Sequence, residues 1–332
     1  MTTENVNNNP KTKPIIKLLY NGKDCTNDFS KYINSVCFRE YEAEQSDELT
    51  LSVNNNNGYF TDSWYPQKGD KFTCDIIFNG DVFKCGTFTI DDNNFDFSVS
   101  GDTAEIKALA TSSNFPVRTV KLKNWSGKTL VQIANEIGGK YGFKVIGSTG
   151  FVNIGTIVQK NESDISFLRR ISKLYGYTFN IKNNLLTFTN MEDLESSESL
   201  FALSKHDLTS LNLSDTVTKV YGKCKVQYRD IKTNTIKTYT AVGSSGSSDT
   251  LPIYKRCFSL EEAKRVANAG LKSSHREVSG RISIANPINT FTAGVNFDLS
   301  DIGRLSGKYH IKTAERRIDN SGYRVEGEII KC

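Results

Sequence analysis

Short segments in which apolar and polar residues alternate dominate the first 110 residues of the chain. Alternation over about four to eight residues predicts β-strands, and turn signals such as Asn21–Gly22, Gly69–Asp70 and Gly101–Asp102 separate the segments. Many short strands at regular spacing predict a sandwich or a barrel. The predicted strands are IIKLLY, INSVCFRE, ELTLSV, KFTCDIIF, DVFKCGTF, FTIDD, FDFSVS and AEIKALA.

Two of the seven cysteines lie in a predicted hairpin, KFTCDIIF-NG-DVFKCGTF. Asn79–Gly80 between two apolar runs is a strong signal for a tight turn, and pairing about it places Cys74 opposite Cys85 and Asp75 opposite Lys84. The two cysteines would form a hydrogen-bonded pair with the wider Cα spacing, which favours free thiols over a disulfide. Since the cysteine count is odd and no C-x-x-C occurs, neither a disulfide framework nor a zinc ribbon is indicated.

A helical pattern appears twice between about residues 115 and 190, at an offset of 34 residues. In each copy an N-cap hydroxyl, Thr129 or Ser163, precedes apolar residues at i, i+3, i+4 and i+7. In the first copy Gln132 completes a pattern like a capping box. A Tyr–Gly step, Tyr141–Gly142 or Tyr175–Gly176, then ends the helix, because glycine adopts the left-handed conformation, and a strand follows. Two copies that each end in a strand argue against a tetratricopeptide array.

Strand patterns return from about residue 197 and are interrupted by one helix, predicted at 259–272. Ser259-x-x-Glu262 is a capping box, and an apolar face follows it. The segment GSSGSSD from Gly243 predicts a flexible loop, and the polar residues 1–13 predict a disordered arm. The order along the chain is therefore β, then α/β, then β with one helix.

Composition supports this prediction and excludes several classes of protein. A length of 332 residues is enough for two or three domains, and 11% aromatic residues with six prolines favour short strands. The formal charge of +5 is too small to indicate a nucleic-acid-binding tail or a polybasic membrane patch. Because the N-terminus lacks the apolar core of a signal peptide and no apolar run could span a bilayer, we expect neither export nor membrane insertion.

The residues that most often carry chemistry do not cluster in the sequence. The three histidines are far apart and predict surface or strand-edge positions, the acidic pairs predict surface turns and a helix N-terminus, and the basic run predicts a solvated strand face. These residues are His206, His275 and His310; Asp91–Asp92, Glu192–Asp193 and Glu261–Glu262; and Lys312 to Arg317. No Gly-rich phosphate loop occurs, so we predict no catalytic, metal-binding or cofactor-binding residue and no cofactor.

Three aromatic residues in turn-rich surroundings are candidates for subunit contacts. Trp64, Tyr65 and Trp125 could lie at the edge of a core or could anchor an interface, where aromatic side chains are enriched. The residues alone leave both alternatives open.

The segment from Glu162 to Phe188, with Ser126 to Phe143 before it and Leu305 to Ile329 near the end, resembles the late control protein D family. These are baseplate hub proteins of contractile phage tails and of R-type bacteriocins, and the hub part of type VI secretion spike proteins is similar. The most specific string is E-S-D-x-x-F-L-x-R-x-x-x-x-Y-G. Its residues here are Glu162, Ser163, Asp164, Phe167, Leu168, Arg170, Tyr175 and Gly176.

The resemblance implies a β-rich α+β fold with two tail-tube-like β-barrel domains, at 14–110 and 196–332, and an α/β insert at 111–195. It implies a homotrimeric ring that adapts a hexameric tail tube to a trimeric spike. The implied partners are a tail tube or tube-initiator protein, a separate spike protein, other baseplate proteins and the tape measure protein. The implied location is the bacterial cytoplasm during assembly and then the baseplate of the particle.

Two other hypotheses compete with the hub. The two central units also resemble degenerate lysin-motif units, which suggests a module that binds or cuts peptidoglycan. A nucleic-acid-binding channel is disfavoured, because the sequence shows no concentrated basic stripe.

Overall fold

The computed structural model describes residues 13–43, 45–110, 119–147, 154–182, 185–216, 221–230, 232–243, 247–274 and 278–332. The predicted arm lies outside these residues except for Lys13, as does part of the predicted GSSGSSD loop. The chain forms two compact units, each assembled from separated segments. Unit 1 comprises Met1–Arg39, Glu48–Ser113 and Glu315–Val325, and unit 2 comprises Glu40–Asp47, Asn114–Ala314 and Glu326–Cys332.

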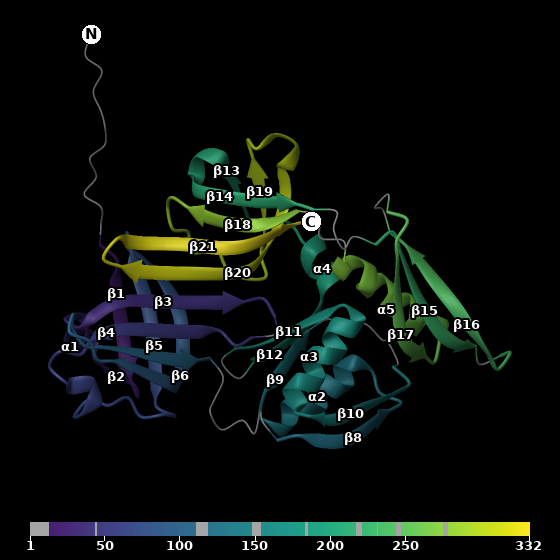
Figure 1. The fold of residues 1–332 in the computed structure, drawn as a ribbon, viewed down its shortest axis with the longest axis horizontal. Helices are drawn as coiled ribbons and strands as arrows, with labels where there is room; N and C mark the ends of the chain where they lie inside the picture. The colour runs from purple at the N-terminus through teal and green to yellow at the C-terminus, as the bar shows by residue number, and fades with distance from the viewer. Residues whose placement is uncertain are drawn as a thin grey trace, which may run out of the picture. The chain divides into compact units, whose positions relative to one another are not determined.

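Unit 1 is an antiparallel β-structure around an aromatic-rich core (Figure 1). Its strands follow the order β3-β4-β7-β6-β5-β1-β2, and the Glu315 end of β20 adjoins β3. Along β4 every second residue is buried, as the alternating sequence predicted. The elements are β1 (Ile15–Tyr20), β2 (Lys23–Asp24), α1 (Thr26–Ser30), β3 (Ile33–Tyr41), β4 (Glu48–Asn54), η1 (Tyr59–Thr61), β5 (Lys71–Phe78), β6 (Asp81–Asp96), β7 (Thr103–Leu109) and β20 (Gly307–Asp319).

The hairpin of β5 and β6 has the predicted turn but a different register beyond it. Asp75 lies opposite Lys84, as predicted, whereas Cys74 pairs with Gly86 and not with Cys85. A β-bulge shifts the register between Cys74 and Asp75, where Gly86 adopts a φ of 112°. The predicted opposition of Cys74 and Cys85 is therefore wrong, and both side chains are buried free thiols.

The predicted strands FTIDD and FDFSVS are parts of one long strand. β6 runs without a break from Asp81 to Asp96 and pairs first with β5 and then with β7. A second irregularity between Ile90 and Asp92 lets the strand bend while it continues. The pair Asp91–Asp92 accordingly lies within a strand and not in a surface turn.

The α/β region of unit 2 contains the two predicted repeats. In the first, β8 precedes α2 and β9; in the second, β10 precedes α3 and β11. β8 pairs antiparallel with β10, while β9, β12 and β11 form a three-stranded sheet. The bounds are β8 (Lys121–Ser126), α2 (Leu130–Lys140), β9 (Lys144–Gly147), β10 (Thr156–Glu162), α3 (Asp164–Tyr175), β11 (Tyr177–Lys182), β12 (Leu185–Asn190) and α4 (Met191–Ser196).

The last third of the chain contributes to two different sheets of unit 2. One contains β14, β18, β21 and β20, with β19 beside β20 and β13 beside β19. The other is a three-stranded sheet, β16-β15-β17, whose core is shared with helix α5 and the α/β region. The bounds are β13 (Phe201–Ser204), η2 (Lys205–Asp207), β14 (Leu208–Asp215), β15 (Lys223–Asp230), β16 (Thr235–Val242), β17 (Thr250–Cys257), α5 (Leu260–Ser274), β18 (Val278–Ile284), β19 (Asn296–Ser300), η3 (Gly303–Leu305) and β21 (Gly322–Lys331).

Candidate functional site

The ends of the two repeated helices are fixed by the residues that the sequence indicated. Thr129 accepts a hydrogen bond from the backbone N–H of Gln132, and the Gln132 side chain completes the capping box of α2. Ser163 caps α3 in the same way through the N–H of Ser166. At the other end of α3, Gly176 adopts the left-handed conformation with a φ of 72°. Both units therefore have the predicted order of cap, helix, Tyr–Gly step and strand.

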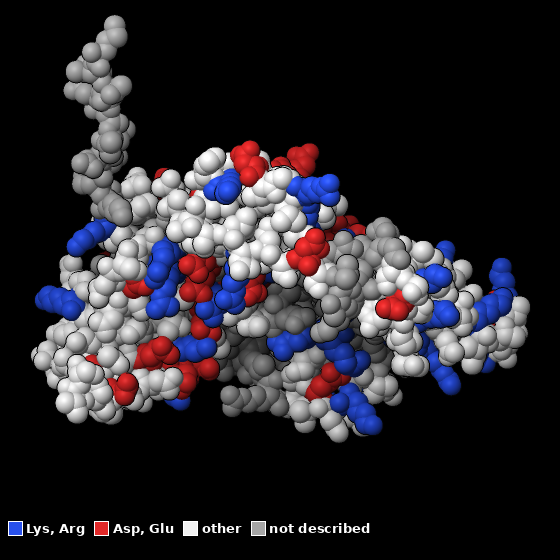
Figure 2. Space-filling model, turned by 45° about the horizontal axis from the view of Figure 1, so that its top comes forward, with Lys and Arg blue, Asp and Glu red and all other residues white. Residues whose placement is uncertain are grey.

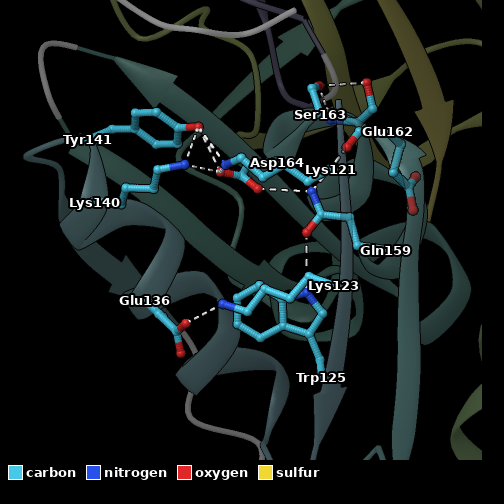
Figure 3. Close-up of polar contacts among 11 residues, drawn as sticks. Lys121, Lys123, Trp125, Glu136, Lys140, Tyr141, Gln159, Glu162, Ser163 and Asp164 are labelled. Carbon is cyan, nitrogen blue, oxygen red and sulfur yellow. Dashed lines mark hydrogen bonds and ion pairs between the residues drawn. The ribbon is translucent and has the colours of Figure 1, made fainter. Parts of the chain in front are cut away.

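Asp164 is the centre of a polar cluster that joins α3 to the first repeat (Figure 3). Its carboxylate forms ion pairs with Lys121 of β8 and with Lys140 at the end of α2, the latter at 3.1 Å. Tyr141 donates a hydrogen bond of 2.6 Å to Oδ2, and Gln159 donates one of 2.9 Å to Oδ1. The Asp164 side chain is only 4% exposed, so these four groups replace its hydration.

The surroundings of Asp164 keep it ionised. Burial alone raises the pKa of a carboxyl group, but the hydrogen bonds from Lys121, Tyr141 and Gln159 outweigh burial and hold the pKa of Asp164 well below its usual range. Burial and the bond to this carboxylate raise the pKa of Tyr141. Burial lowers the pKa of Lys121, although its bond to Asp164 opposes that shift. The cluster thus holds a buried carboxylate between two lysines, which suits a structural role.

Trp125 connects this cluster to the hydrophobic core. Its indole N–H donates to Oε1 of Gln159 at 3.2 Å, across the same offset of 34 residues that separates the repeats. The ring stacks on Phe167 with centroids 5.7 Å apart, and the Lys123 ammonium lies 3.7 Å from the ring centroid. Glu136 pairs with Lys123 on the surface (Figure 3). With an exposure of 2%, Trp125 occupies a core position in this chain, and its predicted role as a subunit contact stays a prediction.

The other motif residues also make contacts within unit 2. Glu162 pairs with Arg170 at 2.6 Å, and Arg170 donates a further bond to the carbonyl of Val158. Phe167 and Leu168 are fully buried in the core. The motif therefore determines how α3 packs against β10.

The end of the motif reaches a helix that lies far along the chain. Tyr175 donates a hydrogen bond of 2.5 Å to Glu262 of α5, and Lys255 pairs with the same carboxylate. The second Glu262 oxygen accepts from the N–H of Phe258, while Ser259 caps α5 by accepting from the N–H of Glu262. Glu262 lies in the first turn of α5, as the predicted helix N-terminus required, and its side chain is fully buried, which the local sequence did not indicate because Tyr175 is remote in the chain.

A second buried polar cluster surrounds His310. Its Nδ1 lies 2.6 Å from Oδ1 of Asn296, and its Nε2 lies 3.1 Å from Oε1 of Glu42. Lys312 also pairs with Glu42. Burial raises the pKa of a carboxyl group, but the contacts with His310 and Lys312 outweigh it and lower the pKa of Glu42 to about 2.

His310 is fully buried, so its predicted surface or strand-edge position is wrong, whereas His206 is exposed and His275 lies outside the described residues. The prediction of a solvated strand face for the run from Lys312 to Arg317 is also wrong in part. Arg316 is 1% exposed, with its guanidinium 3.6 Å from the centroid of the Phe83 ring.

The predicted anchors Trp64 and Tyr65 lie in unit 1. Trp64 is half-buried and stacks on Tyr59 with centroids 5.2 Å apart, and it also packs against Phe29. Tyr65 is 38% exposed and stacks on Phe95. Tyr65 therefore retains an exposed aromatic surface, and a contact role for Trp64 and Tyr65 stays a prediction.

The described residues contain no group of three or more His, Cys, Asp or Glu side chains that could hold a metal ion. Among the same residues, no helix is both long enough and apolar enough to cross a membrane. The buried charges that the sequence did not predict each serve to join segments that are distant in the chain. The geometry supports a structural scaffold that is stabilised by buried polar clusters.

No protein-family model matches the sequence. The chain is similar to the probable baseplate hub proteins of Escherichia phages 186 and P2, with 23% and 24% identity over 178 residues. That match covers 53% of this chain and 44% and 45% of those proteins, so it spans less than half the length of either relative.

Solved structures extend the likeness over nearly the whole chain. The 43 kDa tail protein of prophage MuSo2 from Shewanella oneidensis has a TM-score of 0.71 at 16% identity, covering 96% of this chain and 98% of that one. A type VI secretion system component from E. coli has a TM-score of 0.58 at 9% identity, covering 95% and 77%. The fold is thus a β-rich tail-protein fold, and the chain is related in sequence to phage baseplate hub proteins, as the resemblance to the late control protein D family predicted.

Proposed function

We propose that the protein is a structural baseplate hub of a contractile tail or a related injection particle, without enzymatic activity. The observation that carries this proposal is the agreement of two comparisons: a sequence similarity to probable baseplate hub proteins and a tail-protein fold over 96% of the chain. The buried motif residues Asp164 and Tyr175 fit this role, because their polar contacts stabilise the scaffold internally.

In its finer form, the proposal is a homotrimeric ring. Each chain would supply two tube-like barrel domains, so that three chains present a pseudo-sixfold surface to a hexameric tube and a threefold surface to a spike. The lysin-motif-like units of the α/β region would act as packing elements. Tube or tube-initiator protein, spike protein, other baseplate proteins and the tape measure protein are the proposed partners, and the baseplate is the proposed final location.

The experiment is to purify the full chain, measure its mass by light scattering over a range of concentrations, and then co-express it with candidate tube and spike proteins. We expect a species of three chains and co-purification with both partners. A protein that stays monomeric and ignores both partners contradicts the proposal.

The alternative is a peptidoglycan-binding or wall-degrading tail protein that acts through the two central units. Retention of the full chain on purified peptidoglycan, together with clearing in a zymogram, would favour it. Loss of that retention on substitution of exposed residues of α2 or α3 would assign it to these units.

A further inference from the structure

The three-stranded sheet β16-β15-β17 has one covered face and one open face. Helix α5 packs on the first face, where Cys224, Val226 and Ala241 are buried with Ala263 and Val266 of the helix (Figure 1). The intervening residues of the strands point to the opposite face and are exposed. Within the described residues, no further strand pairs with the outer edge of β16 or β17.

The open face is basic. Three basic residues of β15 share this face, because they are two and four positions apart: Lys223, Lys225 and Arg229. On β17, Arg256 lies opposite Gln227 of β15. Their cross-strand neighbours on β16, which are Val242, Thr240, Thr238 and Ile236, include no acidic residue. Lys223, Lys225 and Arg256 form no ion pair within the described part of the chain. Figure 2 shows Lys and Arg side chains gathered at the end of the molecule where Figure 1 draws these strands.

Exposed apolar side chains are interleaved with these charges. Tyr254 is 97% exposed, Val242 72% and Ile236 60%. A surface that binds only the phosphate backbone of a nucleic acid gains little affinity from such apolar residues. Aromatic and apolar side chains beside arginine are instead typical of protein interfaces. The chemistry therefore favours an acidic protein surface as the partner.

The chain itself carries an acidic β-surface. Residues 48–113 contain ten Asp and Glu against four Lys and Arg. On β6 and β7, Glu105 lies opposite Asn94, and Asp96 lies two residues further along the same face. The same face carries Lys107 opposite Asp92, but Lys107 pairs with Glu48 and Asp92 pairs with Lys68, so Asp96 and Glu105 remain as its unpaired charges in the part of the chain that the structure describes. Both carboxylates are exposed, and within the described residues neither forms an ion pair.

We propose that the basic face of β15–β17 on one copy of the chain binds the acidic outer face of β6–β7 on the next copy, head to tail. This inference rests on the proposed trimer. A ring closed by rotation needs two different, complementary surfaces on every subunit, and these two faces are complementary in charge. Interfacial charge pairs of this kind set the register of the contact and speed its formation.

The experiment compares charge reversals on the two faces of the full-length chain. Lys223→Glu/Lys225→Glu alters the basic face, and Asp96→Lys/Glu105→Lys alters the acidic face. Lys160→Glu/Lys173→Glu is the matched control for the basic-face variant, because both lysines are exposed in the α/β region and the change in net charge is the same as in Lys223→Glu/Lys225→Glu. Far-ultraviolet circular dichroism and thermal unfolding verify that each variant is folded.

We expect each interface variant to weaken trimer formation about tenfold or more per reversed pair, measured by sedimentation velocity over a concentration series. Combining the two double reversals should restore much of the association, the control should leave it unchanged, and added salt should weaken the wild-type trimer.

If the wild type forms a trimer and each double reversal leaves that trimer unchanged, this inference is overturned and the proposed hub is left intact. The same holds if the combined variant associates more weakly than either double reversal alone. A wild-type chain that is always monomeric overturns both. A DNA duplex that binds the wild type and not Lys223→Glu/Lys225→Glu, with the mass unchanged, assigns the face to nucleic acid instead.

Discussion

Tyr175 and Glu262 are 87 residues apart in the chain and share a hydrogen bond of 2.5 Å in the core of unit 2. Tyr175 is the last residue of helix α3, and Glu262 lies in the first turn of α5. Burial and the neighbouring negative charge of Glu262 raise the pKa of Tyr175, so the phenol stays protonated and donates at every ordinary pH. One bond therefore ties the α/β region to the sheet that carries the proposed contact face.

Removal of the Tyr175 hydroxyl should destabilise the protein by about 1–2 kcal/mol, because the buried Glu262 carboxylate loses one of its three donors. Glu262→Ala should cost more, about 3–5 kcal/mol, since it leaves the Lys255 ammonium, 17% exposed, without its counter-charge. Denaturant unfolding of Tyr175→Phe and Glu262→Ala measures both. Equal losses for the two variants would contradict the assignment of a buried ion pair.

Acid should destabilise unit 2 through Glu42. The folded-state pKa of about 2 lies below the value of about 4.3 for an unfolded glutamate. The group therefore contributes stability that is complete above about pH 4.5 and is lost as the pH falls through its folded pKa. Unfolding free energies measured from pH 6 to pH 2 should fall less steeply in Glu42→Gln than in the wild type, and identical slopes would show that the contacts with His310 and Lys312 do not stabilise the charge.

Gly176→Ala should destabilise the protein more than Gly142→Ala. Both glycines have positive φ, 72° and 73°, so alanine is strained by about 1 kcal/mol at either position. A Cβ at Gly176 would also lie 3.0 Å from the Cβ of Ala269, whereas one at Gly142 would have nothing within 4 Å. The difference between the two midpoints of urea unfolding isolates the contact with α5, and it should vanish if that contact is absent in solution.

Asp164→Asn should cost about 3 kcal/mol in unfolding free energy, because it leaves Lys121 and Lys140 facing a neutral amide at a buried position. Glu136→Gln removes the carboxylate that pairs with Lys123 and Lys128, yet it should cost less than about 1 kcal/mol, since Glu136 is 40% exposed and solvent screens those pairs. Thermal unfolding of both variants at low and high salt provides the comparison. A greater loss for Glu136→Gln would reverse our ranking of the two clusters.

Features set by neighbouring residues were predictable from the sequence. The hydroxyls of Thr129 and Ser163 and the left-handed Gly176 act within one turn of a helix, so the helix bounds agreed closely with the prediction. The turn at Asn79–Gly80 was equally local, but the bulge beyond it depends on how β6 continues toward β7, which the hairpin alone does not encode.

The burial of several charges could not be predicted, because at least one partner of each is remote in the chain. Nothing near Glu262 in the sequence indicates Tyr175, and nothing near His310 indicates Glu42. Arg316 sits in a charged run that suggests solvent, yet its guanidinium covers the Phe83 ring. The resemblance to the hub family identified the residues of the Ser163–Asp164 motif, while only the structure revealed that they form hydrogen bonds and ion pairs within unit 2.

The discontinuity of unit 1 has a consequence for synthesis on the ribosome. Its core includes Ile318 and packs against Tyr323, both from the segment Glu315–Val325, whereas the rest of the unit comes from the first 113 residues. At roughly 5–20 residues per second, the ribosome needs on the order of 10 to 40 seconds to translate the intervening stretch. During that interval the strands of the first third lack the core contributions of Ile318 and Tyr323, so unit 1 completes its folding only after residue 325 has been translated.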